Sequence, residues 1–204
     1  NDAPVISSIA VLSVDEDSAY SYTTTATDVD GDTVTLTCTT VPSWLSCTAG
    51  ALSGTPADAD VGSHSVVITA TDGNSGSATD SFSIAVANTN DAPTITSTAV
   101  TAATEDAAYT YTVTTADGDS GDTVTLTGTT VPSWATFTAS TGVLAGTPLD
   151  ANVGDNAVVI TASDGDVSVT DTFTIAVANT NDAPSISSTA VTAASEDVAY
   201  SYSI

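Results

Sequence analysis

The stretch Phe82-Ser83-Ile84-Ala85-Val86-Ala87-Asn88-Thr89-Asn90-Asp91-Ala92-Pro93 decides the architecture of this chain. Its first half alternates large apolar residues with small ones, which is the pattern of a β-strand with one buried face. Its second half is a polar linker. The same pattern closes a second segment of the chain, where Phe173 opens the strand and Pro184 ends the linker. The chain is therefore expected to consist of tandem β-domains joined by one recurring linker.

The period of the repeat follows from the tetrapeptide Asn-Asp-Ala-Pro. It starts at Asn1, Asn90 and Asn181, at intervals of 89 and 91 residues. Repeats of about 90 residues can close a hydrophobic core of their own, so they are expected to be whole domains. We predict a first repeat over residues 1–89, a second over 90–180, and the start of a truncated third over 181–204. The chain is accordingly interpreted as a window on a longer array.

Composition predicts an all-β fold. Thr, Val and Ser are abundant, Met is absent, and helix-forming residues such as Leu, Glu, Lys and Arg are scarce or missing. About seven strands per repeat are expected, the size of a Greek-key antiparallel β-sandwich. In the first repeat they are an opening strand over 6–14, segments at 20–22, 33–37, 66–70 and 82–86, and two short strands around Trp44 and Leu52.

The charge of the chain points to a bound cation. It contains 25 acidic residues and no Lys or Arg, giving a formal net charge of −25. The acids divide as 11, 11 and 3 over the three expected repeats, and the only glutamates, Glu16, Glu105 and Glu196, occupy equivalent positions. Each glutamate is followed by Asp, two further residues and Tyr. Charge spread for solubility alone has no reason to keep that register.

The same composition excludes classes of partner. Without basic residues the chain offers no phosphate-binding surface, so nucleic acid and anionic membranes are not expected partners unless cations bridge them. No stretch approaches the roughly 18 apolar residues of a membrane span, so direct membrane insertion is not expected.

Three further motifs recur in both full repeats. They are Val-Pro-Ser-Trp at 41–44 and 131–134, Gly-Thr-Pro at 54–56 and 146–148, and Ala-x-Asp at 70–72 and 162–164. Together with the linker, they resemble the dystroglycan-type cadherin-like domains, also described as Ig-like repeats, of large bacterial and archaeal surface proteins. This resemblance implies Greek-key sandwiches joined end to end, with calcium (Ca²⁺) at the junctions, in an adhesin or another extracellular, cell-surface protein.

The cadherin-like pattern also implies a set of calcium ligands. At the first junction these are Glu16, Asp58, Asp60, Asn88, Asn90, Asp91, Asp117, Asp119 and Asp164, with Ala92 offering its carbonyl. The equivalent positions at the other repeat ends are Asp2, Asp28, Asp30, Asp72, Glu105, Asp150, Asn152, Asn179, Asn181 and Asp182. The sequence departs from the pattern in two places. Asn88 stands where the pattern has Asp, and Asn152 replaces the Asp60 of the first repeat, so the second junction is expected to bind calcium more weakly.

The chemistry of the residues supports calcium without the resemblance. Calcium takes roughly six to eight oxygen ligands from carboxylates, amides and backbone carbonyls. Two like charges about 5 Å apart repel by roughly 3 kcal/mol at an effective dielectric of about 20, so acids gathered at one junction need a divalent cation. Two alternatives stay open: the Asp and Asn residues cap turns, or the acids form the surface of a halophile's protein.

Few other residues offer chemistry. Trp44 and Trp134 recur beside proline at the same place, so we expect core packing rather than sugar-stacking platforms. We expect His64, the only histidine, at the surface, since the second repeat has Asn156 there. No nucleophile is paired with a base in the usual way, so no enzyme active site is expected in this chain.

Cys38 and Cys47 occur only in the first repeat, and the second repeat has Gly128 and Phe137 at these positions. Both positions change together, a small residue facing a large one, as expected if the two sites touch across neighbouring strands. A disulfide, typical of an oxidising extracellular setting, is the prediction, and two buried free thiols are the alternative.

These observations predict a calcium-rigidified stalk, extender or filament segment of a secreted, cell-surface adhesion-type protein. Its expected partners are neighbouring repeats of the same protein, with self-assembly and cell-surface glycans as further candidates. The alternative function is a carbohydrate-binding module of an exported protein, and an enzyme comes third. A stalk predicts buried aromatic residues and calcium at the junctions, whereas a sugar-binding module predicts exposed Trp or Tyr beside a groove in each repeat.

Overall fold

The structure is a computed structural model that describes residues 1–204. It contains eighteen β-strands and two short 3₁₀ helices, so the predicted all-β fold is confirmed. The chain forms two compact units. The first unit comprises Asn1–Thr96, Thr114–Leu126 and Thr161–Thr170, and the second comprises Ser97–Val113, Thr127–Ile160 and Asp171–Ile204.

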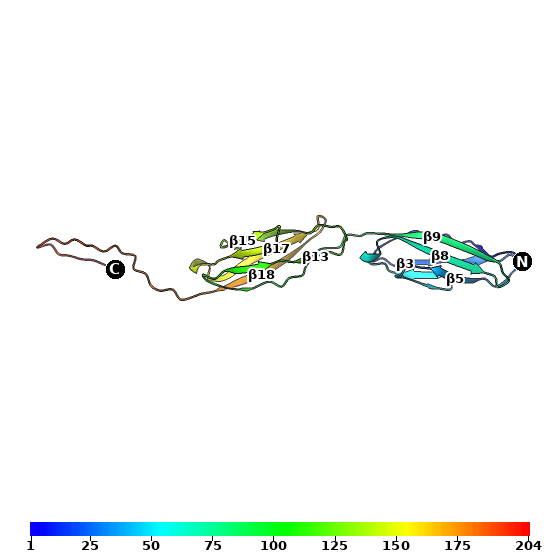
Figure 1. Ribbon diagram of the computed structural model, residues 1–204, viewed down its shortest axis with the longest axis horizontal. Helices are drawn as coiled ribbons and strands as arrows, with labels where there is room; N and C mark the ends of the chain where they lie inside the picture. Colours follow the sequence, from blue (N-terminus) through cyan, green and yellow to red (C-terminus); the bar gives the residue numbers. More distant parts are fainter. The chain divides into compact units, whose positions relative to one another are not determined.

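The first repeat holds nine strands and one 3₁₀ helix. They are β1 (Val5–Ile6), β2 (Ser13–Asp15), β3 (Tyr20–Thr23), β4 (Ala26–Thr27), β5 (Thr35–Thr40), β6 (Leu45–Thr48), β7 (Ala51–Gly54), η1 (Asp58–Asp60), β8 (Gly62–Thr71) and β9 (Ser77–Ala87). A four-stranded sheet has the order β2-β9-β8-β5, a three-stranded sheet the order β3-β7-β6, and β1 pairs with β4 (Figure 1).

The second repeat has the same elements in the same order. They are β10 (Thr94–Ile95), β11 (Ala102–Thr104), β12 (Tyr109–Thr112), β13 (Thr115–Ala116), β14 (Thr125–Thr130), β15 (Ala135–Thr138), β16 (Val143–Gly146), η2 (Asp150–Asn152), β17 (Gly154–Ser163) and β18 (Ser168–Ala178). The sheets are β11-β18-β17-β14, β12-β16-β15 and β10-β13.

The opening strand differs from the expectation of one segment over 6–14. It is divided into β1 and β2, which belong to different sheets. β1 pairs antiparallel with β4, whereas β2 runs parallel to the end of β9, with Ser13 opposite Ala85. The segment between them crosses from one layer of the sandwich to the other, so its backbone cannot follow a single ladder. Such breaks explain why each repeat has nine strands where about seven were expected.

The core of the first repeat follows the predicted alternation. Val66, Ile68 and Ala70 of β8 are fully buried, as is Ile84 of β9, because successive side chains of a strand point to opposite faces. Trp44 packs against this core, and its ring meets that of Tyr20 edge-on at a centroid distance of 5.9 Å.

The residues after β18 form no strand (Figure 1). Tyr200 and Tyr202, at the positions of the buried Tyr20 and Tyr22, are 53% and 37% exposed. Tyr200 nevertheless donates its hydroxyl hydrogen bond to the carbonyl of Val191 at 2.6 Å.

The corresponding hydroxyls of the full repeats are buried. Tyr20 donates to the carbonyl of Val11 at 2.8 Å, and Tyr109 donates to that of Val100 at 2.7 Å. Burial raises the pKa of Tyr20 to about 12, and the neighbouring Tyr22 adds to the shift. The pKa of Tyr109 is likewise raised to about 12 by burial and Tyr111.

We predict that alkaline unfolding begins with these two hydroxyls. A folded-state pKa raised above the unfolded value of about 10 contributes stability that is complete below pH 10 and is lost as the pH rises towards 12. An absorbance titration of phenolate should therefore show two late-titrating tyrosines. Tyr20→Phe should remove one of them and reduce the loss of stability over that range. Titration of all six tyrosines near pH 10 in the folded protein would contradict the prediction.

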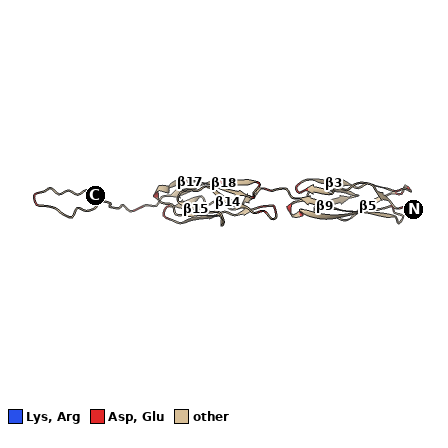
Figure 2. Ribbon diagram, turned by 90° about the horizontal axis from the view of Figure 1, so that it is seen from above, with Lys and Arg blue, Asp and Glu red and all other residues tan.

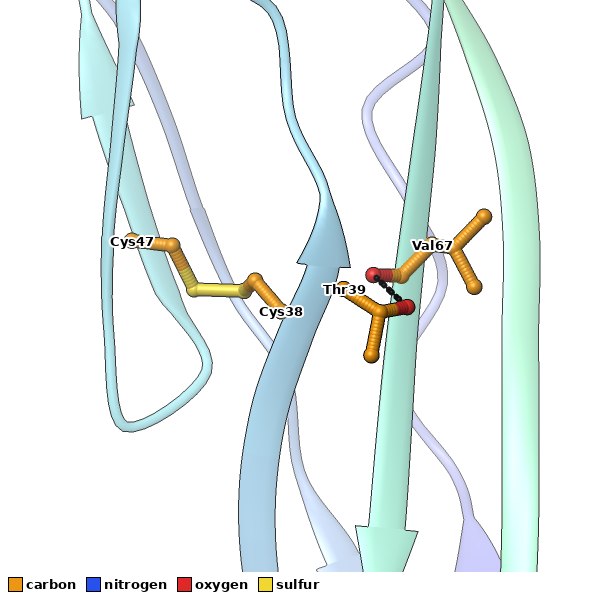
Figure 3. Close-up of a disulfide and its surroundings, with 4 residues drawn as sticks. All are labelled: Cys38, Thr39, Cys47 and Val67. Atoms are coloured by element: carbon orange, nitrogen blue, oxygen red, sulfur yellow. Dashed lines mark hydrogen bonds between the residues drawn. A yellow bond between two sulfur atoms is a disulfide. The ribbon is translucent and has the colours of Figure 1, made fainter.

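The two cysteines are joined in a disulfide between β5 and β6, with their Cα atoms 6.3 Å apart (Figure 3). These strands belong to different sheets, so the bond links the two layers of the sandwich rather than neighbouring strands of one sheet. In the second repeat, a Cβ atom on Gly128 would lie 3.0 Å from the Cβ of Phe137. There the Phe137 ring takes the space next to the glycine, so packing replaces the covalent link.

We predict that reduction of Cys38–Cys47 destabilises only the first repeat. A cross-link that closes a loop this short restricts the unfolded chain, and its loss should cost about 2 to 3 kcal/mol. Denaturant unfolding, followed by hydrogen exchange in each repeat with and without reductant, measures this change. The second repeat has no cysteine and serves as the internal control. Equal destabilisation of both repeats would contradict the prediction.

Candidate functional site

The acidic residues lie mostly in the loops at the ends of the strands (Figure 2). Four groups bring three carboxylates together, with oxygen atoms that lie within 4.8 Å of one another. The groups are Asp17, Asp58 and Asp91; Asp28, Asp30 and Asp32; Glu105, Asp106 and Asp182; and Asp117, Asp119 and Asp122. No Lys or Arg side chain exists in this chain to neutralise them.

Glu16 is the most deeply buried of the predicted ligands in the first repeat. It directly follows β2 and is 1% exposed. One of its carboxylate oxygens accepts a 2.7 Å hydrogen bond from the backbone N–H of Thr89 in the linker. Its second oxygen, Oε2, is buried and has no hydrogen-bond partner. An ionised carboxylate buried in this way is costly unless a charged partner compensates it.

Glu105 repeats this arrangement in the second repeat. It is 2% exposed, accepts a 3.1 Å hydrogen bond from the N–H of Thr180, and leaves its Oε1 buried without a partner. Two equivalent glutamates therefore each present one unpaired, buried oxygen where the linker leaves the repeat.

Asp17 and its equivalent Asp106 were not predicted as ligands. Both have a left-handed backbone, with φ of 55° and 59°. Their N–H groups donate to the carbonyls of Pro56 and Pro148 at 2.8 and 2.9 Å, which ties the end of the opening strand to the Gly-Thr-Pro turn. The turn leads into the 3₁₀ helix that carries Asp58, so Asp17 and Asp58 come together. The signal was present in the sequence, because an Asp follows the glutamate in every copy.

The linker also contacts the Asp-Gly-Asp loop, and all residues involved belong to the first compact unit. The N–H of Asp91 donates to Asp119 at 2.6 Å, and the side-chain amide of Asn88 donates to the other oxygen of Asp119 at 2.7 Å. The amide of Asn90 donates to Asp164 at 3.0 Å. Five of the predicted ligands are therefore brought together around this linker.

The same bonds recur where the first repeat begins. The N–H of Asp2 donates to Asp30 at 2.6 Å, and the amide of Asn1 donates to Asp72 at 2.8 Å. Asp28 in this loop has a buried carboxylate oxygen without a partner. Its equivalent in the second repeat, Asp117, has one too.

Gly118, between Asp117 and Asp119, permits a close approach. A Cβ atom at this position would lie 2.6 Å from a carboxylate oxygen of Asp58 and 2.7 Å from one of Asp91. The first repeat has Val29 at the equivalent position, where the side chain is 79% exposed. The absence of a side chain at Gly118 thus lets the loop approach the Asp17, Asp58 and Asp91 group.

The electrostatics of the linker reflect this crowding. Burial raises the pKa of Asp91, and the neighbouring charges of Asp58 and Asp119 raise it further. The pKa of Asp182 is raised by the neighbouring carboxyl group of Asp150, through a hydrogen bond and through its charge, and burial adds to the shift. In contrast, the N–H of Val167 and the amide of Asn90 lower the pKa of Asp164. Uncompensated negative charge therefore gathers at Asp91 and Asp182.

Asp60 and Asn152 show why one predicted ligand differs between the repeats. The Asp60 carboxylate accepts a hydrogen bond from the N–H of Ala57 at 3.1 Å, and the Asn152 amide oxygen accepts one from Leu149 at 2.9 Å. Both side chains therefore cap the start of a 3₁₀ helix, a role that needs an oxygen but no charge. Neither residue belongs to a group of three carboxylates.

The linker asparagines of the second repeat bond locally. Asn179 donates to the carbonyl of Thr180 at 2.7 Å, and Asn181 donates to that of Asp182 at 3.2 Å. Among the other residues predicted at this end, Asp182 lies with Glu105 and Asp106.

His64 is half-buried, unlike the surface position expected for it. Its Nε2 bonds to the carbonyl of Asp60 at 2.6 Å, and its ring meets that of Trp44 edge-on at 6.0 Å. Asn156 takes the same role in the second repeat, where it donates to the carbonyl of Asn152 at 2.9 Å and accepts from the indole of Trp134 at 3.0 Å. The residue at this position therefore fastens the 3₁₀ helix to the tryptophan.

We predict that His64→Ala destabilises the first repeat by about 1 to 2 kcal/mol, because the Asp60 carbonyl and the Trp44 ring lose their partner. His64→Asn, which reproduces the second repeat, should retain most of the stability. Thermal unfolding of both variants, with hydrogen exchange at Asp60 and Val61, measures the difference. If His64→Asn were as destabilising as His64→Ala, the fastening role would be refuted.

Comparison with known proteins places the two repeats in a family. A family model described as "Putative Ig domain" matches residues 3–87 and again residues 92–178. The chain belongs to this Ig-domain family. The comparison with curated proteins gave no match. No helix of the structure has the length and apolar character that crossing a membrane requires.

Solved structures show that the Ig-family repeats share a cadherin-like fold. PcdhgB3 EC1-4 matches with a TM-score of 0.60 at 18% identity, over 89% of this chain and 50% of that chain. Human protocadherin-24 EC1-2 matches with a TM-score of 0.54 at 18% identity, over 88% of this chain and 100% of that chain.

An enzyme is also among the similar structures. The endo-fucoidan hydrolase MfFcnA4, from glycoside hydrolase family 107, is 29% identical over 89% of this chain, with a TM-score of 0.41. This chain spans only 29% of the length of that enzyme.

Proposed function

We propose that this protein is a calcium-binding extender segment of an extracellular adhesion-type protein, in which Ca²⁺ binds where one Ig-family repeat passes into the next. The observation that carries the proposal is the buried, unpaired carboxylate oxygen of Glu16, repeated at Glu105. In a chain without Lys or Arg, a cation from solution is the partner that such an oxygen requires.

The residues at the first linker fit calcium. Glu16, Asp17, Asp58 and Asp91 would supply carboxylate oxygens, as would Asp119 from the Asp-Gly-Asp loop. A mixture of carboxylate and carbonyl oxygens in irregular loops suits calcium, whereas Mg²⁺ demands a tight octahedron. When bound, the ion would supply positive charge that removes the repulsion raising the pKa of Asp91.

The role of the ion follows from where its ligands come from. Glu16 and Asp58 belong to the sandwich of the first repeat, Asp91 to the linker, and Asp119 to a loop of the second repeat. A shared ion restricts the linker, while each apolar core forms without metal. Restriction of linkers in tandem repeats suits a segment that extends or projects other parts of a protein at a cell surface. The tryptophans pack against the cores, and no observation of the structure favours the carbohydrate-binding alternative.

We predict that Glu16→Gln has opposite effects without and with calcium. In chelator it should stabilise the first repeat by about 1 to 3 kcal/mol, because a buried negative charge with one unpaired oxygen is replaced by a neutral amide. The wild type should gain about 1 to 3 kcal/mol in ~10 mM calcium, for a Kd of about 10⁻⁴ to 10⁻³ M, and the variant should lose most of this gain. Calorimetric titration and thermal unfolding measure both effects.

The controls separate binding from general charge effects. Asp155→Asn removes an exposed acid in β17 that belongs to none of the four acidic groups, and it should leave the calcium response unchanged. Magnesium should reproduce little of the stabilisation. Calcium should also slow hydrogen exchange at the N–H groups of Thr89 and Asp91, which bond to Glu16 and Asp119. A wild-type protein that binds no calcium by calorimetry would refute the proposal.

A further inference from the structure

Strand β2, near the start of the first repeat, lies beside β9, the last strand of that repeat, and the two run parallel. At one end of this pair the N–H of Ala85 donates to the carbonyl of Leu12 at 2.8 Å, and at the other the N–H of Glu16 donates to the carbonyl of Ala87 at 2.9 Å. We call β2 and the end of β9 the parallel pair of the first repeat. Every other strand pairing of this repeat is antiparallel.

The second repeat contains an equivalent parallel pair, formed by β11 and the end of β18. The N–H of Ala176 donates to the carbonyl of Thr101 at 2.9 Å, and the N–H of Glu105 donates to that of Ala178 at 2.9 Å. The backbone bonds that close the pair at its two ends are therefore the same in both repeats.

The direction of these strands decides how tension acts on a repeat. The chain enters the parallel pair at the start of β2 and leaves it at the end of β9, and in parallel strands these two points lie at opposite ends of the pair. Tension along the chain therefore slides β2 and β9 past each other and loads all their hydrogen bonds at once. β1, which precedes the pair, is joined to β4 at only two residue positions and is expected to detach first.

The side chain at the centre of the pair differs between the repeats. Val14 of β2 is half-buried and packs against the hydrophobic core, whereas the equivalent residue of β11 is Ala103. A hollow of about 300 Å³ lies along β11, and Ala103, Ala108 and Tyr109 are among the residues that line it. Since apolar stabilisation grows with the area that is buried, the packing holds β2 more firmly than β11.

We propose that each full repeat bears tension through its parallel pair, and that the second repeat yields to tension before the first. A segment with unequal repeats releases the length of one repeat while the other stays folded, so a sudden load is absorbed without unfolding the whole segment. This function goes beyond joining repeats in a line, because it gives the fold of each repeat a mechanical task.

This mechanical function does not depend on the calcium site. The hydrogen bonds that close each parallel pair are made by backbone groups, which need no ion. The same order of unfolding is therefore expected with calcium and in chelator, so that failure of one proposal leaves the other standing.

Single-molecule force spectroscopy of the 204-residue chain, held through peptide tags at its two ends, tests the proposal. The disulfide identifies the first repeat, because it keeps a stretch with a sequence separation of 9 from extending and should shorten the released length by roughly 25 Å. The longer unfolding step, from the second repeat, should come first and at the lower force. A shorter step that comes first, or steps in random order, would overturn the proposal.

Reductant provides a control for the disulfide itself. It should lengthen the shorter step by the same amount and leave the order of the steps unchanged, since the disulfide lies outside the parallel pair and acts on the unfolded chain. A reversed order in reductant would show that the disulfide, rather than the parallel pair, sets the order.

Exchange of the central side chains tests why the repeats differ. Val14→Ala should raise the unfolding rate of the first repeat at constant force by roughly tenfold, and Ala103→Val should lower that of the second by a similar factor. The double variant should therefore reverse the order of the long and short steps. An unchanged order in the folded double variant would overturn the assignment.

Two proline variants of β9 test the parallel pair itself. Ala85→Pro removes the N–H that donates to Leu12, whereas Ser83→Pro removes an N–H on the same side of the strand that has no backbone partner. Only Ala85→Pro should lower the force of the shorter step. Circular dichroism and thermal unfolding show whether each variant is folded, and the exchange of Val14 and Ala103 supplies the test if Ala85→Pro does not fold. Equal forces for the two folded proline variants would show that the parallel pair does not bear the load.

Discussion

The buried carboxylate of Glu16 is the constraint on which the junction depends. An acid that is 1% exposed and bonded on one oxygen to the linker leaves its other oxygen without a partner, in a chain that contains no Lys or Arg. Burial of charge is tolerated where a counter-charge compensates it. The proposed calcium ion would supply that charge and would give the remaining acids a physical reason to lie close together, since each would add an oxygen to one positive centre.

Neutral contacts hold these acids in place. Asp17 bonds through its backbone to the Gly-Thr-Pro turn, and the residue at 64 fastens the following 3₁₀ helix to Trp44. The side chain at position 64 differs between the repeats without loss of this contact. Asn156 bonds to the carbonyl of Asn152, as His64 bonds to the carbonyl of Asp60. The hydrogen bonds around the acids can therefore be made by different side chains, and the residues that make them vary between the repeats. The glutamate and the Asn-Asp-Ala-Pro linker, in contrast, recur unchanged.

The two repeats hold the two layers of the same sandwich together in different ways. Cys38 and Cys47 link the layers covalently, whereas Gly128 and Phe137 fill the same space by packing. The exposed surface differs as well, since the second repeat has threonines where the first exposes Val5, Ile9 and Leu12. None of these residues belongs to the acidic groups, so the repeats differ in packing and surface while they keep the same linker sequence.

The sequence by itself determined the period, the all-β class and the buried faces of the strands, because alternation and turn chemistry are local properties of the chain. Val66, Ile68 and Ala70 of β8 show this directly, since they lie on the face that their alternation predicts and are fully buried. Only the tertiary structure decided that the opening segment crosses between sheets, that His64 is half-buried, and that Asp17 joins Asp58 and Asp91 while Asp60 caps a turn. These outcomes depend on which distant segments meet, and spacing along the chain does not specify such contacts.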